Sequence, residues 1–187
     1  MKKFVISFLL IIINTYIFAN FADIDTLRLK VVEKTRTQGR EKVMSYDLVI
    51  KFPDLIYKEV LTPALNRGEK YIYKENKKIV YIPLLQQFEE YEMLEQENQI
   101  FNVIDDIKNI HTRNIKYTLN DSGNIEKILY RSGNEIILDN YKDYEGIFFP
   151  SEMIVLENNA VLAELSFSDI EINMEVSNTL FQIDRVD

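Results

Sequence analysis

The chain has 187 residues and no cysteine, which excludes disulfides, thiolate metal sites, a cysteine nucleophile and a lipid anchor on an N-terminal cysteine. Its formal net charge of −8 argues against nucleic-acid binding, because such proteins present a basic surface to the phosphates. Eleven tyrosines, eleven phenylalanines and only five glycines are typical of β-sheet, and the length predicts one domain with a sizeable core.

Residues 1–19 have the anatomy of a secretory signal peptide. Lys2 and Lys3 give a positive head, and an apolar run follows that is shorter than the roughly 20 residues a spanning helix needs. Cleavage is predicted after Ala19 or Ala22, which places the mature protein in the periplasm. The alternative is an uncleaved anchor at the inner membrane, but no positive flank follows the run.

Apolar and polar residues then alternate with the two-residue period of β-strands, beginning with Leu27, Leu29 and Val31. The next strand is the clearest in the chain, because Ser45, Asp47 and Lys51 fall on one face and apolar residues fall on the other. That apolar face consists of Met44, Tyr46, Leu48, Ile50 and Phe52. One face of this strand is therefore expected to meet an apolar interior.

Residues 46–92 predict five consecutive strands separated by turn residues. Pro53 ends the first strand because proline has no N–H to donate to a sheet, and residues 63–68 form a loop. Residues 75–77 read as a short hairpin loop, and Pro83 ends the strand that follows it. The five strands are predicted at residues 47–52, 55–61, 69–74, 78–82 and 87–93.

Residues 94–110 change to helical spacing. Polar residues lie opposite an apolar stripe of Ile100, Val103, Ile104 and Ile107, which predicts an amphipathic helix. Because a long antiparallel sheet that does not close must cover its apolar face, this helix is predicted to lie against the concave side.

Strand periodicity returns after the helix. Hairpin signals at residues 121–124, 132–134 and 157–159 separate strands predicted at residues 114–119, 125–130, 135–141, 153–156 and 161–170, with a further break between Gly146 and Pro150. The last strand places Val161, Ala163, Leu165 and Phe167 on one face. The fold prediction for residues 23–187 is a mainly β (α+β) domain of about ten strands: a strongly curved antiparallel sheet with one helix as lid.

No catalytic or cofactor signature is present. His111 is the only histidine and lacks partners at zinc-ligand spacing, so it is interpreted as a loop or helix-end residue. A Ser–His–Asp site is not excluded by sequence distance, but there is no G-x-S-x-G elbow and no phosphate-binding loop. Asp105 and Asp106 are predicted on a solvated helix face, and Glu89 and Glu90 on a strand surface. The prediction is a non-enzyme without metal or cofactor.

The strand breaks and aromatic residues of the central region follow a pattern seen in a known family. The pattern comprises a strand ending at Pro53, a strand ending at Thr62-Pro63, Gly68-Glu69-Lys70-Tyr71-Ile72-Tyr73, Tyr81-Ile82-Pro83 and Gln86-Gln87. It resembles the LolA-type outer-membrane lipoprotein carriers and the lipoprotein-sorting proteins of their superfamily. The resemblance implies an incomplete barrel with helices as a lid over a hydrophobic cavity, and Leu180-Phe181 resembles the family's final strand.

Two features depart from the family. Residues 23–26 leave little room for the usual N-terminal helix. In the best-studied carriers an arginine just before the proline matched by Pro53 holds the lid by hydrogen bonds, and here that position is Phe52. A phenyl ring cannot donate such bonds, and Lys51 points to the opposite face. Either apolar contact alone holds the lid, or the protein is not a full lipoprotein shuttle.

The resemblance implies a monomeric periplasmic carrier or binding protein for a lipid or acylated lipoprotein, with an inner-membrane donor complex and an outer-membrane acceptor as partners. The candidate cavity lining is Met44, Tyr46, Leu48, Ile50, Phe52, Val161, Ala163, Leu165 and Phe167, and the candidate lid residues are Ile100, Val103, Ile104 and Ile107. Two alternatives stay open. One is an envelope sensor that binds a lipoprotein or membrane partner without transport, and the other is a structural domain in which these residues are simply core.

Overall fold

A computed structural model describes residues 21–37, 39–92, 98–110 and 112–182. It contains one eleven-stranded antiparallel sheet, helical residues at Phe21 and Ala22, the helix α2 (Gln99–Lys108) and two short 3-10 helices, η1 (Ala64–Asn66) and η2 (Asn178–Phe181). The strands are β1 (Thr26–Thr37), β2 (Arg40–Lys51), β3 (Leu55–Thr62), β4 (Lys70–Lys74), β5 (Lys77–Ile82), β6 (Gln87–Glu92), β7 (Lys116–Leu119), β8 (Ile125–Leu129), β9 (Asn134–Tyr144), β10 (Ile147–Glu157) and β11 (Ala160–Ile172). The predicted fold class is confirmed.

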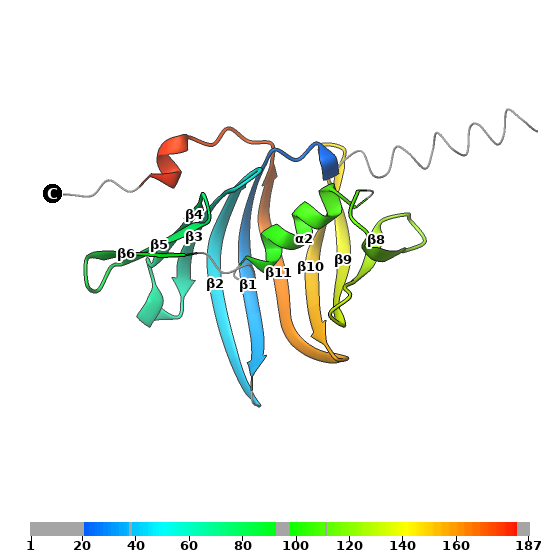
Figure 1. The fold of residues 1–187 in the computed structure, drawn as a ribbon, viewed down its shortest axis with the longest axis horizontal. Coiled ribbons are helices and arrows are strands. Elements are labelled where there is room, and N and C mark those ends of the chain that lie inside the picture. The colour runs from blue at the N-terminus through cyan, green and yellow to red at the C-terminus, as the bar shows by residue number, and fades with distance from the viewer. Residues whose placement is uncertain (1–20, 38, 93–97, 111, 183–187) are drawn as a thin grey trace, which may run out of the picture.

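The order of strands explains why a helix crosses the sheet. The order is β6-β5-β4-β3-β2-β1-β11-β10-β9-β8-β7, so β1 and β11 pair in the middle while β6 and β7 form the two free edges. The chain between β6 and β7 must therefore pass from one edge to the other, and α2 lies in this crossing. Figure 1 shows α2 lying across β1, β11 and β10 on one side of the curved, unclosed sheet.

The side of the sheet that α2 covers, here called the inner face, carries the main core. Alternation in β1 and β2 sends Leu27, Leu29 and Ile50 to this face, where none is more than 1% exposed. Each fully buried aliphatic side chain of this kind contributes about 1.5–3 kcal/mol relative to exposure. The inner face and the apolar stripe of α2 thus form one continuous hydrophobic cluster.

The opposite side, here called the outer face, has a smaller cluster. Val49, Tyr57 and Ile72 are buried there by Phe181 from η2. The prediction of a final strand at Leu180-Phe181 is wrong, because Ser177 accepts a hydrogen bond from the Thr179 N–H and starts a 3-10 turn instead. The C-terminal segment covers the outer face rather than extending the sheet.

A second correction concerns Pro150, which lies inside β10 rather than in a break. Pro150 faces Tyr141 of β9, whereas the register with β11 begins only at Glu152. At Pro150, β10 does not yet pair with β11, so the sheet has room for a residue without an N–H donor.

The described chain begins with Phe21 and Ala22 in helical conformation, residues 23–25 lead into β1, and Phe21 and Ile24 join the inner core. The expectation of a shortened N-terminal helix stays a prediction, because residues 1–20 lie outside the described residues. The predicted signal peptide and Ala19 lie outside the described residues, as do residues 94–97 of the predicted helix. Among the residues that are described, none of the helices is long and apolar enough to span a membrane.

Candidate functional site

The predicted cavity residues mostly gather on the inner face. Tyr46, Leu48 and Ile50 of β2 are buried, and Met44 of β2 and Phe52, which follows β2, pack against the same cluster. From β11, the residues in the same cluster are Ala163, Leu165 and Phe167. Val161 is partly exposed beside a register shift near the β10–β11 hairpin and lies outside this cluster. Eight of the nine residues thus line one surface, and their contact with a ligand stays a prediction.

The apolar stripe of α2 fills most of the space over that surface. Ile100, Val103, Ile104 and Ile107 are each no more than 6% exposed. Between them, Phe149 and Phe167 only a gap of about 10 Å³ remains. Among the described residues, the lid residues beneath the middle of the helix therefore pack as core.

A larger pocket of about 190 Å³ opens at the N-terminal end of α2. Strands β1, β2, β3 and β11 supply its floor, and the first residues of the helix supply its roof. Its lining is mixed rather than apolar, and comprises Glu33, Tyr46, Leu48, Ile56, Lys58, Asn98, Gln99, Ile100, Phe101 and Leu165. Polar side chains thus meet the apolar inner face at one end of the lid.

Lys58 is the cation of this pocket. Its Nζ lies 3.8 Å from the ring centroid of Tyr46 and 5.8 Å from that of Tyr71, which are cation–π distances. Burial lowers the pKa of Lys58 from its ordinary value, although the negative charge of Glu33 opposes this shift. Across the described part of the chain, no carboxylate lies within ion-pair distance of Lys58.

The neighbouring carboxylates are held by tyrosines instead. Tyr46 donates its hydroxyl to Glu33 at 2.9 Å, and Tyr71 donates to Glu69 at 2.7 Å. Burial, reinforced by Glu33, raises the pKa of Tyr46 above its ordinary value, so this hydroxyl stays protonated and remains a donor.

Phe52 takes part in holding the lid. Its ring stacks on Phe101 of α2 with centroids 5.4 Å apart. One face of the Phe52 ring also meets a cation, because Lys108 Nζ lies 4.3 Å from its centroid, while the same ammonium donates to the carbonyl oxygen of Ile24. Ring stacking and a cation–π contact thus occupy the position at which the resemblance implies hydrogen bonds from an arginine.

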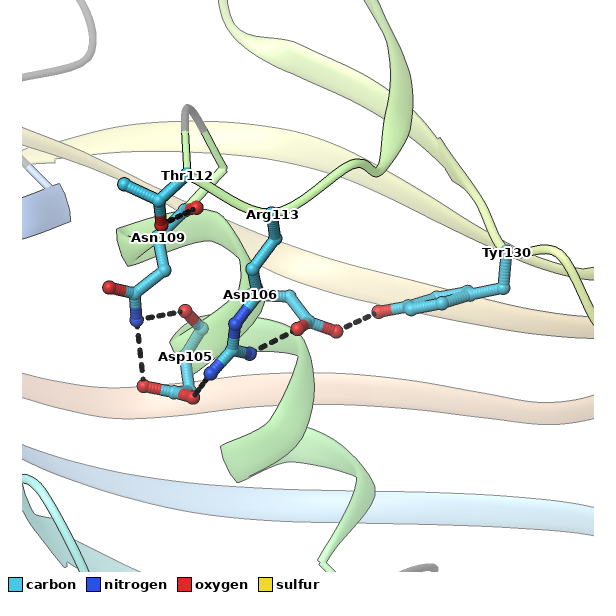
Figure 2. A network of polar contacts seen from close by, with 6 residues as sticks. All are labelled: Asp105, Asp106, Asn109, Thr112, Arg113 and Tyr130. Atoms are coloured by element: carbon cyan, nitrogen blue, oxygen red, sulfur yellow. Dashed lines mark hydrogen bonds and ion pairs between the residues drawn. The ribbon is translucent and has the colours of Figure 1, made fainter.

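The C-terminal end of α2 is held by a polar network (Figure 2). Arg113 bridges Asp105, at 2.5 Å, and Asp106. Tyr130, which follows β8, donates its hydroxyl to Asp106 at 2.7 Å. The prediction that Asp105 and Asp106 lie on a solvated face is therefore wrong, since both carboxylates are mostly shielded and bonded. Arg113 and Tyr130 supply partners that helical periodicity cannot reveal.

The remaining candidate groups do not form a site. Glu89 and Glu90 lie on edge strand β6, where Glu90 pairs with Lys77, so their interpretation as strand-surface charge is confirmed. His111 lies outside the described residues. Within the described ranges, no group of three or more histidine, aspartate or glutamate side chains is arranged to hold a metal ion.

Comparisons with known proteins give likeness in structure but none in sequence. No family model matches, and neither does any curated protein. A LolA superfamily protein from Nitrosomonas europaea superposes with a TM-score of 0.63 at 16% identity, covering 91% of this chain and 98% of that one. A DUF1329 family protein from Desulfovibrio piger gives 0.62 at 12% identity, covering 88% and 92%.

A domain from Vibrio parahaemolyticus assigned to the outer membrane lipoprotein-sorting proteins gives a TM-score of 0.57 at 11% identity, covering 83% of this chain and 88% of that one. Identities this low carry information about the fold alone. The chain therefore has the fold of the LolA superfamily and of the lipoprotein-sorting domains, as the strand breaks in its central region indicate.

Proposed function

We propose that this protein is a periplasmic carrier or binding protein for lipids or acylated lipoproteins. The observation that carries the proposal is the pairing of an open, curved sheet with a helix whose apolar stripe covers the apolar inner face. A guest that replaces the helix on this face meets a continuous hydrophobic surface. Each methylene group so hidden from water contributes about 0.8 kcal/mol, which makes an acyl chain a favourable guest.

The conformation described is the closed one. The pocket of about 190 Å³ is smaller than the roughly 300–1,000 Å³ of common ligand sites. In this proposal an acyl chain longer than this pocket enters when α2 moves off the inner face. Because the guest replaces contacts that α2 already makes, its net affinity is moderate, which suits a protein that must release its cargo. In this proposal the protein binds and releases its guest without a chemical reaction.

The packed interior also favours a second function. With the space beneath Val103 and Ile104 filled, the protein in its closed form suits a sensor or regulator that responds to a lipoprotein or membrane partner without transporting it. The two functions differ in whether a lipid is retained after purification.

The first test is chemical analysis of the native protein. The protein is purified from a bacterial envelope without detergent, and its organic extract is examined by mass spectrometry. The carrier proposal predicts a stoichiometric amphiphile in the extract. An empty protein that captures a membrane partner in pull-downs supports the sensor, and an empty protein that also fails to bind a lipophilic dye contradicts both functions.

The second test fixes the lid. Because the chain has no cysteine, Phe52→Cys/Phe101→Cys introduces a unique pair at the stacked rings, which a short bifunctional thiol reagent can bridge. Bridging is expected to abolish binding of a fluorescent acyl probe, and cleavage of a reducible bridge is expected to restore it. Each single-cysteine variant treated with the same reagent is the control. Unchanged binding after bridging contradicts entry beneath α2.

A further inference from the structure

The pocket at the N-terminal end of α2 contains the positive charge of Lys58, which has no role in binding an apolar chain. In β3, side chains alternate between faces, so Ile56, Lys58 and Val60 point to the inner face. Ile56 and Val60 are buried as this pattern requires, and Lys58 places an ammonium group between them. A cation at an inward position of a chain with net charge −8 calls for a physical reason.

The contacts of Lys58 leave its charge incompletely compensated. Two tyrosine rings approach the ammonium, but a cation–π contact supplies only about 0.5–2 kcal/mol and no hydrogen-bond acceptor. Glu33, whose negative charge acts most strongly on Lys58, accepts from the Tyr46 hydroxyl rather than forming an ion pair with Lys58. Glu69 is likewise engaged by Tyr71, and the other cations nearby, Lys42 and Lys78, repel Lys58. Lys58 thus lines the pocket without a carboxylate within ion-pair distance in the described part of the chain.

We propose that this pocket binds the anionic head group, carboxylate or phosphate, of a single-chain amphiphile, with Lys58 as its cationic partner. The ammonium donates charge-assisted hydrogen bonds to the head group. The chain then runs along Leu48, Ile56 and Leu165, which line the same pocket, and continues beneath α2. This inference rests on the proposed function, since the tail needs the space that α2 vacates, and it adds selection for a negatively charged head.

The size of the pocket agrees with this division. About 190 Å³ accommodates a head group and the start of a chain without movement of the sheet. Ile100 and Phe101, in the first turn of α2, form the roof directly above, so the chain displaces this end of the helix first. Glu33 lies on the same wall and repels an anion, which limits affinity and provides a second handle for the test.

The test measures dissociation constants by calorimetry for three twelve-carbon probes: dodecanoate, dodecyl phosphate and uncharged dodecanol. The wild-type protein is expected to prefer the two anions. Lys58→Met retains the apolar stem but removes the charge, and is expected to weaken binding of both anions by about tenfold or more while leaving dodecanol unchanged. Lys58→Arg is expected to retain the preference, and Glu33→Gln, which keeps an acceptor for Tyr46, to strengthen anion binding.

The control is Lys34→Met, which removes the same charge from an exposed side chain of β1 that points to the opposite face. Equal affinity for dodecanol and dodecanoate, unaffected by Lys58→Met, overturns the head-group site but leaves the hydrophobic carrier intact. Failure of the wild-type protein to bind any of the three probes overturns both. Preference for one anion over the other identifies a carboxylate or a phosphate as the natural head.

Discussion

Lys58 is the proposed ligand-binding cation, yet the burial of its charge lowers the stability of the folded protein. Its folded-state pKa lies below the ordinary 10.5 because burial penalises the charged form. The unfolded chain therefore holds this proton more readily than the folded protein, and the penalty to folding is complete at neutral pH. As pH rises through the folded-state pKa the penalty decreases, and above 10.5 it has disappeared.

Lys58→Met is consequently expected to raise the free energy of unfolding at about pH 7 relative to the matched Lys34→Met variant. The gain should shrink as pH approaches 10.5, where wild-type Lys58 loses its proton in both states. Urea unfolding at several pH values measures the difference. A lower stability of Lys58→Met at neutral pH would mean that the charge of Lys58 stabilises the folded protein.

The sequence contains a signal for this residue, but a weak one. The strand 55–61 was predictable from alternation, and the same alternation places Lys58 inward between Ile56 and Val60. An inward lysine usually extends its head to solvent, so the pattern alone does not distinguish a buried cation from an exposed one. The tyrosines that enclose it come from β2 and β4, and their approach depends on strand register.

At the scale of elements, helix α2 is held differently at its two ends. Arg113 and Tyr130 bind the carboxylates of its last turns, whereas Asn98 makes no side-chain capping hydrogen bond at its first turn. The first turn rests on the Phe52–Phe101 stack and on the pocket. The polar network thus anchors the last turns of α2 to the residues that follow the helix and to Tyr130.

Tyr130→Phe tests this anchor. It removes the hydrogen bond to Asp106 without changing the ring, and the loss is expected to be about 1–2 kcal/mol because the acceptor is a shielded carboxylate. Amide hydrogen exchange should accelerate in the C-terminal turns of α2 and remain slow in β1 and β2. Tyr81→Phe on β5, away from the helix, serves as the control. Equal exchange in both variants would show that the network does not anchor the helix.

Elements with strict periodicity were predictable, and those defined by distant contacts were not. The five strands from residue 46 to residue 92 and the apolar stripe of α2 follow from spacing and turn residues. The uninterrupted course of β10 through Pro150 depends on where β11 begins to pair, which is a property of the sheet rather than of the strand. The packed interior also depends on how closely α2 approaches the sheet, and spacing carries no information on that.

At the scale of the whole molecule, Phe21 lies between the two predicted signal-cleavage sites and is also part of the core. Its side chain is 8% exposed and stacks on Phe149 with ring centroids 5.7 Å apart. Cleavage after Ala22 would remove this residue, whereas cleavage after Ala19 would keep it. We therefore expect cleavage after Ala19, and Phe21→Ala is expected to cost about 2–3 kcal/mol, less than for a central phenylalanine because it lies near the mature terminus.

The intact mass of the secreted protein measures the cleavage site, and chemical unfolding measures the cost of Phe21→Ala. Leu65→Ala in the β3–β4 connection, where the side chain is 83% exposed, is the control for loss of an apolar residue. A mature protein that starts at Asp23 and is fully stable would contradict the expectation.

The pairing of the first strand with the last has a consequence for how the protein is made. Arg28 faces Glu171 across the middle of the sheet, although 143 positions separate them along the chain. The strands β1–β6 and β7–β11 can each pair with their neighbours in sequence through local hairpins. The two halves join only when β11, the last strand, pairs with β1. Because this central pairing joins residues so far apart along the chain, it carries a larger loop-closure cost than the hairpins, and we expect it to form late in folding.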